Sequence, residues 1–213
     1  MRKPSEHADV ALGLAQELAA RHGCHTVILY GSRARGDARE ESDWDLLGVR
    51  AEGPSVRDAR RTAHGWLDAF VYPESELLAE PVSPLFFRVE GARVLVQQDG
   101  FGDRLIARVE ARLQEGPAPL PPDELEARRL WADKMLERAR VGDAEGNYRR
   151  HWLLTQLLED HFAHRQRWYR GPKAALAELR RDEPELHARY SAALEPGASL
   201  ESIEEAVRAF WPR

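Results

Sequence analysis

The sequence predicts an α+β fold in its first half and an all-α helical bundle in its second half. Three observations support this division. Short β-branched and apolar runs lie in the first half, apolar residues at helical spacing dominate the second, and a proline-rich segment separates the two. We therefore expect a sheet domain at residues 1–115, a linker at 116–122 and a helical domain at 123–213.

The first predicted element is an amphipathic helix over residues 5–21. Val10, Leu14 and Leu18 form one apolar stripe along it, because residues three and four apart share a helix face. Gly23 ends the pattern.

The predicted strands of the sheet domain are short, apolar and rich in β-branched or aromatic residues. Residues 25–31, 44–49 and 66–72 have this character and are bounded by glycine, aspartate or proline, which is typical of strands of one sheet. Residues 91–98 predict a fourth strand, and residues 103–114 have helical spacing.

The second half begins after a proline-rich segment. Residues 115–124 contain four prolines and one glycine, which cannot continue a helix and indicate a semi-rigid linker. The first helices predicted beyond it span residues 124–141 and 148–169, with breaks at Gly142 and Gly146. The next are a helix over 171–181 that starts at Pro172 and a short helix that starts at Pro184. The last spans 199–211, with a cap in the Ser199/Ser202 region.

Composition limits the classes of protein that the chain can represent. It has 213 residues, a hydrophobic share of 43% and a net charge of −5 with both signs interspersed, so we expect no long nucleic acid partner. Its single cysteine, Cys24, excludes an internal disulfide and a multi-cysteine zinc site, and its apolar neighbours predict a buried side chain. No apolar run approaches the roughly 20 residues that span a bilayer, and the start has no apolar signal core. We expect a cytoplasmic protein without a membrane partner.

Two carboxylates stand at the start of the second predicted strand. In an extended strand, Asp43 and Asp45 project from the same face while Trp44 projects from the other. Like charges this close repel, and an apolar sheet partly desolvates them. A divalent cation resolves the conflict, and Mg²⁺ prefers carboxylate, water and phosphate oxygens. The pair therefore predicts a magnesium site.

The end of the first predicted strand has the properties of a phosphate site. Gly31 lacks a Cβ that would block close approach, Ser32 adds a hydroxyl, and backbone N–H groups of such a turn can hold an anion. Arg33, Arg35 and Arg39 follow, each either a phosphate ligand or a solvated turn residue. We select Arg33, the nearest to the Gly-Ser turn, so the segment predicts a metal–nucleoside triphosphate site.

A third carboxylate, Asp68, is the only charged residue of the predicted strand at 66–72. If this strand lies beside the strand at 44–49, Asp68 completes a trio with Asp43 and Asp45. The third carboxylate would bind a second metal ion or accept a proton from an attacking hydroxyl. Two metal ions about 4 Å apart suit in-line displacement at phosphorus.

Gly31-Ser32, ten intervening residues and Asp43-x-Asp45 resemble the GS-x10-DxD signature of the DNA polymerase β-like nucleotidyltransferase superfamily. The segment "GSRARGDAREESDWDL" is similar in particular to its minimal bacterial and aminoglycoside (kanamycin-type) branches. The resemblance covers residues 25–72 and implies a mixed sheet flanked by helices, magnesium, and transfer of a nucleoside monophosphate with release of pyrophosphate. The second half resembles the kanamycin-type substrate domain in layout and in "RWYRGPKAAL".

Five residues of the second half are further candidates. Lys173 stands at a predicted helix start, either exposed or, as the resemblance implies, reaching the triphosphate. Glu159 and Asp160 would serve as a base for an acceptor hydroxyl or lie on a solvated helix face, and we favour the solvated face. His161 and His164, three residues apart, lack a third metal ligand.

Three functions remain open. We favour magnesium-dependent transfer of a nucleoside monophosphate, AMP from ATP or that of another triphosphate, to a hydroxyl of a small molecule. The same chemistry could modify a protein, as in antitoxin-type nucleotidyltransferases that AMPylate a HEPN partner. A non-catalytic nucleotide-binding module is the third, and the retained acidic trio argues against it. The acceptor, the base preference and the oligomeric state stay open.

Overall fold

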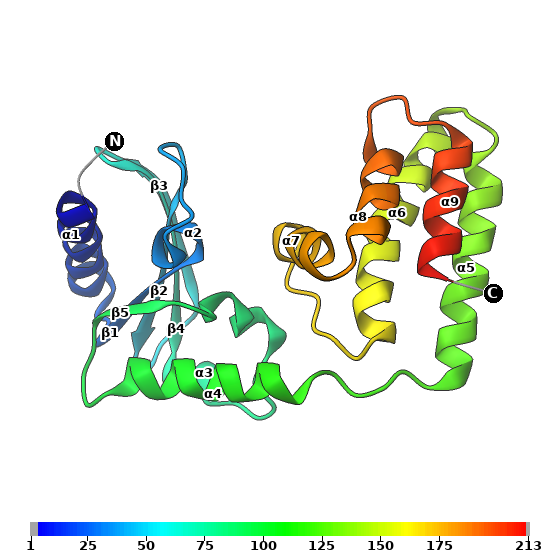
Figure 1. Ribbon diagram of the computed structural model, residues 1–213. Coiled ribbons are helices and arrows are strands. Elements are labelled where there is room, and N and C mark those ends of the chain that lie inside the picture. The colour runs from blue at the N-terminus through cyan, green and yellow to red at the C-terminus, as the bar shows by residue number, and fades with distance from the viewer. Residues whose placement is uncertain (1–3, 212–213) are drawn as a thin grey trace. The chain divides into compact units, whose positions relative to one another are not determined.

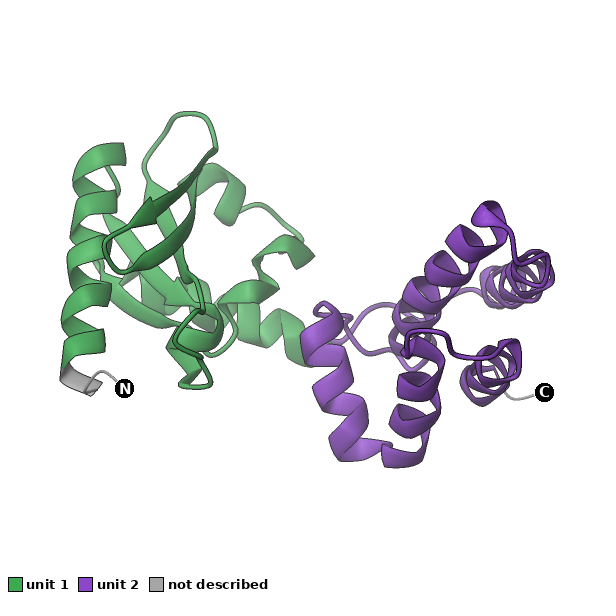
Figure 2. Ribbon diagram, turned by 90° about the horizontal axis from the view of Figure 1, so that it is seen from above, with its two compact units in different colours: residues 1–115 green, residues 116–213 purple. Residues whose placement is uncertain are grey.

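The computed structural model describes residues 4–211 and divides the chain into two compact units, residues 1–115 and 116–213 (Figures 1 and 2). The first unit contains a sheet with flanking helices, and the described part of the second is helical. The predicted α+β fold followed by a helical region is confirmed.

The sheet of the first unit is mixed. Its strands are β1 (Thr26–Tyr30), β2 (Trp44–Arg50), β3 (Val56–Thr62), β4 (Gly65–Pro73) and β5 (Arg93–Val96), in the order β3-β4-β2-β1-β5. β2 and β4 are parallel, and the other neighbouring pairs are antiparallel. The parallel pair places the starts of β2 and β4 at the same edge of the sheet, which brings together two segments that are separated in the sequence by β3.

Helices cover both faces of this sheet (Figure 1). They are α1 (Pro4–His22), α2 (Gly31–Arg35), α3 (Glu74–Leu77), the 3-10 helix η1 (Pro84–Val89) and α4 (Phe101–Glu115). On one face, Leu14 and Leu18 of α1 share a buried cluster with Leu29 and Trp44. On the other, the Tyr72 ring meets Phe86 of η1 edge to face, with ring centroids 5.2 Å apart.

The strand β3 was not predicted from the sequence. Its residues, VRDARRT, are mostly charged, as is common on an edge strand with a single neighbour. They alternate between half-buried and exposed, because alternate side chains project to opposite faces of the sheet. Asp58 and Arg60 point to the α1 side, where they form ion pairs with His22 and Glu17. Ion pairs therefore replace the apolar alternation by which strands are recognised.

The second unit consists of helices joined by short connections. Residues 116–121 have no regular structure, and then come α5 (Pro122–Ala139), α6 (Ala144–His164), α7 (Pro172–Asp182), α8 (Pro184–Leu194) and α9 (Leu200–Phe210). Pro172 and Pro184 begin α7 and α8 as predicted, and the Ser199 hydroxyl accepts the Ser202 N–H at 3.1 Å as the predicted cap.

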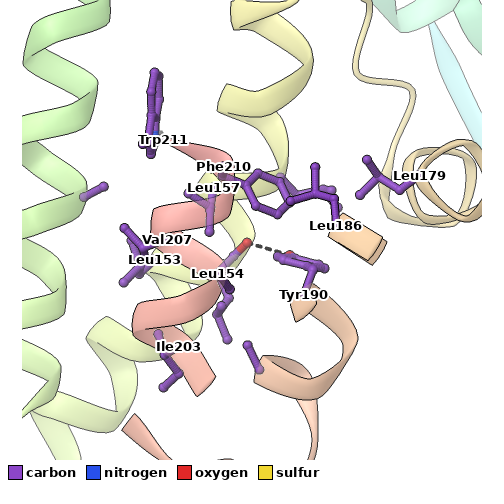
Figure 3. Close-up of a cluster of buried hydrophobic side chains, with 14 of the residues drawn as sticks. Leu153, Leu154, Leu157, Leu179, Leu186, Tyr190, Ile203, Val207, Phe210 and Trp211 are labelled. Atoms are coloured by element: carbon purple, nitrogen blue, oxygen red, sulfur yellow. Dashed lines mark hydrogen bonds between the residues drawn. The ribbon is translucent and has the colours of Figure 1, made fainter. Parts of the chain in front are cut away.

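The core of this unit gathers apolar side chains from α6, α8 and α9 (Figure 3). Leu153 and Leu157 pack with Val207 and Phe210. The buried Tyr190 hydroxyl donates to the Leu154 carbonyl at 2.6 Å, which satisfies the polar end of an otherwise apolar contact.

Two predicted boundaries in this unit were wrong. Gly146 does not break the helix: it lies in the first turn of α6, where the Asp143 side chain accepts its N–H at 2.7 Å. The helix ends at His164 and not at Tyr169, because Gln166 has φ of 55° and the chain turns there. None of the described helices has the length and apolar character needed to cross a membrane.

Candidate active site

The parallel pairing of β2 and β4 sets two predicted site residues side by side. Asp45 and Asp68 are register partners, so both side chains project from the same face of strands about 4.8 Å apart. Asp45 is also the antiparallel partner of Tyr30, the last residue of β1. Trp44 points to the opposite face, where its side chain is buried beneath α1.

Asp43 immediately precedes β2 and is exposed. The Arg33 side chain holds the preceding loop, since its Nε lies 3.0 Å from the Ser42 carbonyl and 3.1 Å from the Asp43 carbonyl. Its guanidinium also lies 4.1 Å from the centre of the Trp44 ring. Arg33 thus fixes the backbone from which Asp43 projects, and its contact with phosphate stays a prediction.

Gly31 is required where α2 begins. Its φ of +73° lies in the left-handed region, and a Cβ placed there would be 2.2 Å from Asp45 Oδ2. Glycine therefore permits the close approach of the Asp45 carboxylate to this turn. The neighbouring Ser32 carbonyl accepts the N–H groups of Gly36 and Asp37 at 3.0 and 3.1 Å, so the predicted turn is a short helical turn.

The charges around Asp45 are unbalanced. Burial raises the pKa of Asp45, and the negative charges of Asp43 and Asp68 raise it further, while Arg35 and Arg88 oppose the change. Burial also raises the pKa of Tyr30 to about 12, so this residue is a neutral phenol at the same face. The site therefore favours a ligand that brings positive charge to Asp45.

Asp68 has a partner that the sequence did not reveal. Arg57 of β3 donates two parallel hydrogen bonds to the Asp68 carboxylate, from Nε to Oδ1 at 2.8 Å and from a terminal nitrogen to Oδ2 at 2.9 Å. The Arg57 guanidinium lies 5.2 Å from the centre of the Phe70 ring, and that of Arg88 lies 4.7 Å from it. Sequence reasoning missed Arg57 together with β3, and it missed Arg88 because η1 carries no strong pattern.

The carboxylates have the chemistry of a hard-cation site. Asp45 has two acidic neighbours and a raised pKa, and a divalent cation would offset that repulsion. Within residues 4–211, no group of three or more His, Cys, Asp or Glu side chains is arranged to hold a metal ion. Arg57 contacts both oxygens of Asp68, and the predicted trio of Asp43, Asp45 and Asp68 is not a ready three-ligand cage.

A cavity of about 700 Å³ lies on the other side of the sheet. Its lining includes His7 of α1, Leu29, Arg33 and Trp44. Because Leu29 and Trp44 belong to the face that α1 covers, this cavity is separate from the face that carries Asp45 and Asp68.

The predicted residues of the second unit have different surroundings. Lys173 is exposed in the first turn of α7. Asp160 does not lie on a solvated face: it is 1% exposed and accepts from Arg128 at 2.8 Å and Gln156 at 3.0 Å. These contacts use the Asp160 carboxylate within the bundle.

The two candidate histidines of α6, His161 and His164, have different surroundings. His161 is buried and its Nε2 lies 3.1 Å from Glu183 Oε1, whereas the exposed His164 ring lies 5.5 Å from the Trp211 ring. Burial lowers the pKa of His161, against the opposing effect of Glu183. Glu159 is half-buried on the same helix. Among the described residues, His161 and His164 belong to no group of three or more His, Cys, Asp or Glu side chains that could hold a metal ion.

One family model matches the part of the chain that carries this site. Residues 13–80 match the family model of the nucleotidyltransferase domain, so the first unit contains a nucleotidyltransferase domain, the domain of a transferase enzyme. No curated protein matches the chain. A solved structure, the nucleotidyltransferase-like protein from Exiguobacterium sibiricum 255-15, is 14% identical with a TM-score of 0.42 over 95% of this chain and 72% of that chain. The predicted resemblance to the superfamily is confirmed, and the kanamycin-type branch stays a prediction.

Proposed function

We propose that the protein is a magnesium-dependent enzyme that transfers a nucleoside monophosphate, AMP from ATP, to a hydroxyl group of a small molecule. The observation that carries this proposal is the register pairing of Asp45 with Asp68 on one face of the sheet, with Gly31 against the Asp45 carboxylate. A nucleotidyltransferase domain at residues 13–80 contains all of these residues.

Asp43 and Asp45 would hold magnesium, and Asp68 would join them when its carboxylate is released. When bound, two magnesium ions would neutralise the triphosphate and polarise its α-phosphorus for attack. This role suits Asp45, whose pKa is raised by burial and by its acidic neighbours.

The chain's own residues have distinct tasks in the proposed reaction. Asp68 accepts the proton of the acceptor hydroxyl, whose oxygen forms the new bond to the α-phosphorus. The bond between the α-phosphorus and its bridging oxygen breaks, and pyrophosphate leaves with the electron pair. Gly31 and Ser32 bind phosphate at the turn, and Arg33 keeps Asp43 in place through the loop carbonyls.

The second unit is proposed to bind the acceptor. It is a separate helical body with its own core. Its Lys173 is exposed at the start of a helix, and a contact of Lys173 with the triphosphate stays a prediction. We place the enzyme in the cytoplasm, where its single buried cysteine remains a free thiol and where magnesium and ATP are available.

One observation favours a protein as the acceptor instead. Tyr148 and Trp152 of α6 are exposed, and the Trp152 ring meets Trp131 of α5 edge to face at 5.4 Å. Aromatic residues gathered on a surface are typical of protein interfaces. A protein acceptor would dock here.

The position of the transferred label tests the chemistry and the acceptor together. The protein is incubated with magnesium and with ATP labelled at the α- or the γ-phosphate. The acceptor is supplied by cell extract that has been separated into a small-molecule fraction and a macromolecule fraction. We expect label from α-ATP, and none from γ-ATP, in a small-molecule product, and no product with Asp45→Asn. Label in a protein would support the alternative acceptor, and transfer from γ-ATP would overturn nucleotidyl transfer.

A further inference from the structure

Arg57 and Asp68 form an ion pair that conflicts with the proposed role of Asp68. Both carboxylate oxygens accept from one guanidinium, at 2.8 and 2.9 Å, in the paired geometry that matches arginine to a carboxylate. A carboxylate held in this way cannot also present those lone pairs to a metal ion. Each oxygen keeps a second lone pair, so opening the pair is what gives a metal ion full access to Asp68 and removes the opposing charge of Arg57.

The surroundings of the pair allow it to open. The Arg57 side chain is 61% exposed and that of Asp68 is 27% exposed, and solvent weakens ion pairs at such positions. β3 is an edge strand, so no further strand lies beside Arg57 on the side away from β4. By contrast, Arg33 is held by several carbonyls of its loop.

A second cation stands on the same face. The Arg88 guanidinium lies 4.7 Å from the centre of the Phe70 ring and 5.9 Å from that of Tyr30, and its charge opposes the raised pKa of Asp45. Because Arg57 also lies over the Phe70 ring, two guanidinium groups flank this ring next to the carboxylates. An arriving metal–triphosphate would meet negative carboxylates for its metal and two arginines for its phosphates.

We propose that Arg57 is a positioning residue that holds Asp68 in the nucleotide-free protein and moves to the phosphates when metal–nucleotide binds. This exchange of partner couples the binding of the metal ion to that of the triphosphate. The metal ion displaces Arg57 from Asp68, and the triphosphate becomes the new partner of Arg57. This inference rests on the proposed function of the carboxylates, and it assigns to Arg57 a role that the sequence did not indicate.

The proposal predicts that removing Arg57 will strengthen the binding of metal alone and weaken the binding of metal with nucleotide. Removing Arg57 removes a competitor for Asp68, so Arg57→Gln should bind Mn²⁺ alone about threefold more tightly. It also removes a phosphate ligand, so the same variant should bind Mn²⁺ with the α,β-methylene analogue of ATP about fivefold more weakly or worse. A purely structural role would not produce this reversal.

Both affinities are measured on the full chain, Mn²⁺ by the paramagnetic signal of the free ion and the analogue by calorimetry. Arg61→Gln is the matched control, because Arg61 lies on the same strand and face about 13 Å away and carries the same charge. It should leave both affinities unchanged. In an Asp68→Asn background, Arg57→Gln should no longer tighten Mn²⁺ binding, and Arg57→Lys should retain part of the nucleotide affinity.

The outcomes separate this inference from the proposed function. If Mn²⁺–nucleotide binding needs Asp45 but Arg57→Gln changes neither affinity, the function stands and the exchange is refuted. The exchange is also refuted if Arg57→Gln weakens Mn²⁺ binding. If Asp45→Asn leaves metal–nucleotide binding intact, the carboxylates are not the metal site and both proposals fail.

Discussion

The buried charges in the core of the second unit are paired, whereas the half-buried Asp45 of the candidate site in the first unit is not. In the second unit, Asp160 meets Arg128 and Gln156, Glu178 meets Arg167 and Arg170, and His161 meets Glu183. In the first unit, Asp45 stands among the carboxylates of Asp43 and Asp68, and its pKa is raised. Its arginine neighbours, Arg35 and Arg88, reduce this repulsion without cancelling it.

Whether a buried charge has a partner of opposite sign distinguishes charges that stabilise the fold from charges that bind a ligand. A buried charge that is fully paired needs no ligand, and removing one partner destabilises the fold. A cluster of like charges costs folding energy and persists where a ligand compensates it, as at catalytic sites. The contrast predicts that substitutions of charged residues at the candidate site will mainly lower transfer activity, and that substitutions of paired charges in the second unit will mainly lower stability.

The largest expected effect is on activity in the first unit. Asp45→Asn keeps the volume of the side chain and removes the charge that would bind magnesium, so transfer from α-labelled ATP should fall by about a thousandfold or more. Circular dichroism should show an intact fold. Wild-type activity in this variant would remove Asp45 from the chemistry.

The next effect is on the stability of the second unit. Asp160→Asn leaves Arg128 without its buried carboxylate partner, and breaking such a pair should cost about 3 kcal/mol. Denaturant unfolding measures this loss. Glu124→Gln is the control, because Glu124 is the more exposed partner of the same arginine and should cost less than about 1 kcal/mol. Equal losses for the two variants would contradict the contrast between buried and exposed pairs.

A smaller effect is expected at the turn that touches Asp45. Gly31→Ala forces a side chain into a left-handed conformation and against Asp45 Oδ2, at a cost of about 1–2 kcal/mol. Transfer activity should fall with it, because the Asp45 carboxylate must move. Gly36→Ala is a useful control, since Gly36 has φ of +84° but its Cβ would meet nothing within 4 Å. Loss of activity in both variants alike would assign the effect to backbone strain.

The smallest effect is the pH dependence of stability. The folded pKa of Asp45 lies above its ordinary value of 3.8, so the folded protein holds this proton to higher pH than the unfolded chain does. Its ionised form therefore lowers stability as the pH rises above 3.8. Asp45→Asn should match wild type at lower pH and melt higher at neutral pH, by about 3 °C or less. A variant that melts lower at neutral pH would show that Asp45 stabilises the metal-free fold.

Local patterns of residues predicted much of the fold and part of the site. The apolar runs of β1, β2 and β4 were visible, and the spacing of Gly31, Asp43 and Asp45 indicated the site. The strand β3 was not visible because charged side chains on both of its faces form ion pairs, and Arg57 was missed with it. The burial of Asp160 was missed as well, because its partner Arg128 lies on another helix, 32 residues away in the chain.

The central claim is that Asp43 and Asp45 bind nucleotide through a divalent metal, and thermal melting tests it most directly. A ligand present at 100 times its dissociation constant stabilises a protein by about 2.7 kcal/mol, which corresponds to a shift of roughly 5–10 °C for a chain of this size. We expect ATP with magnesium to raise the melting temperature of the wild-type protein, and neither ATP with EDTA nor magnesium alone to do so. The shift should disappear in the Asp43→Asn, Asp45→Asn double variant. An equal shift for ATP with EDTA, or a full shift in the double variant, would contradict the metal-bridged site.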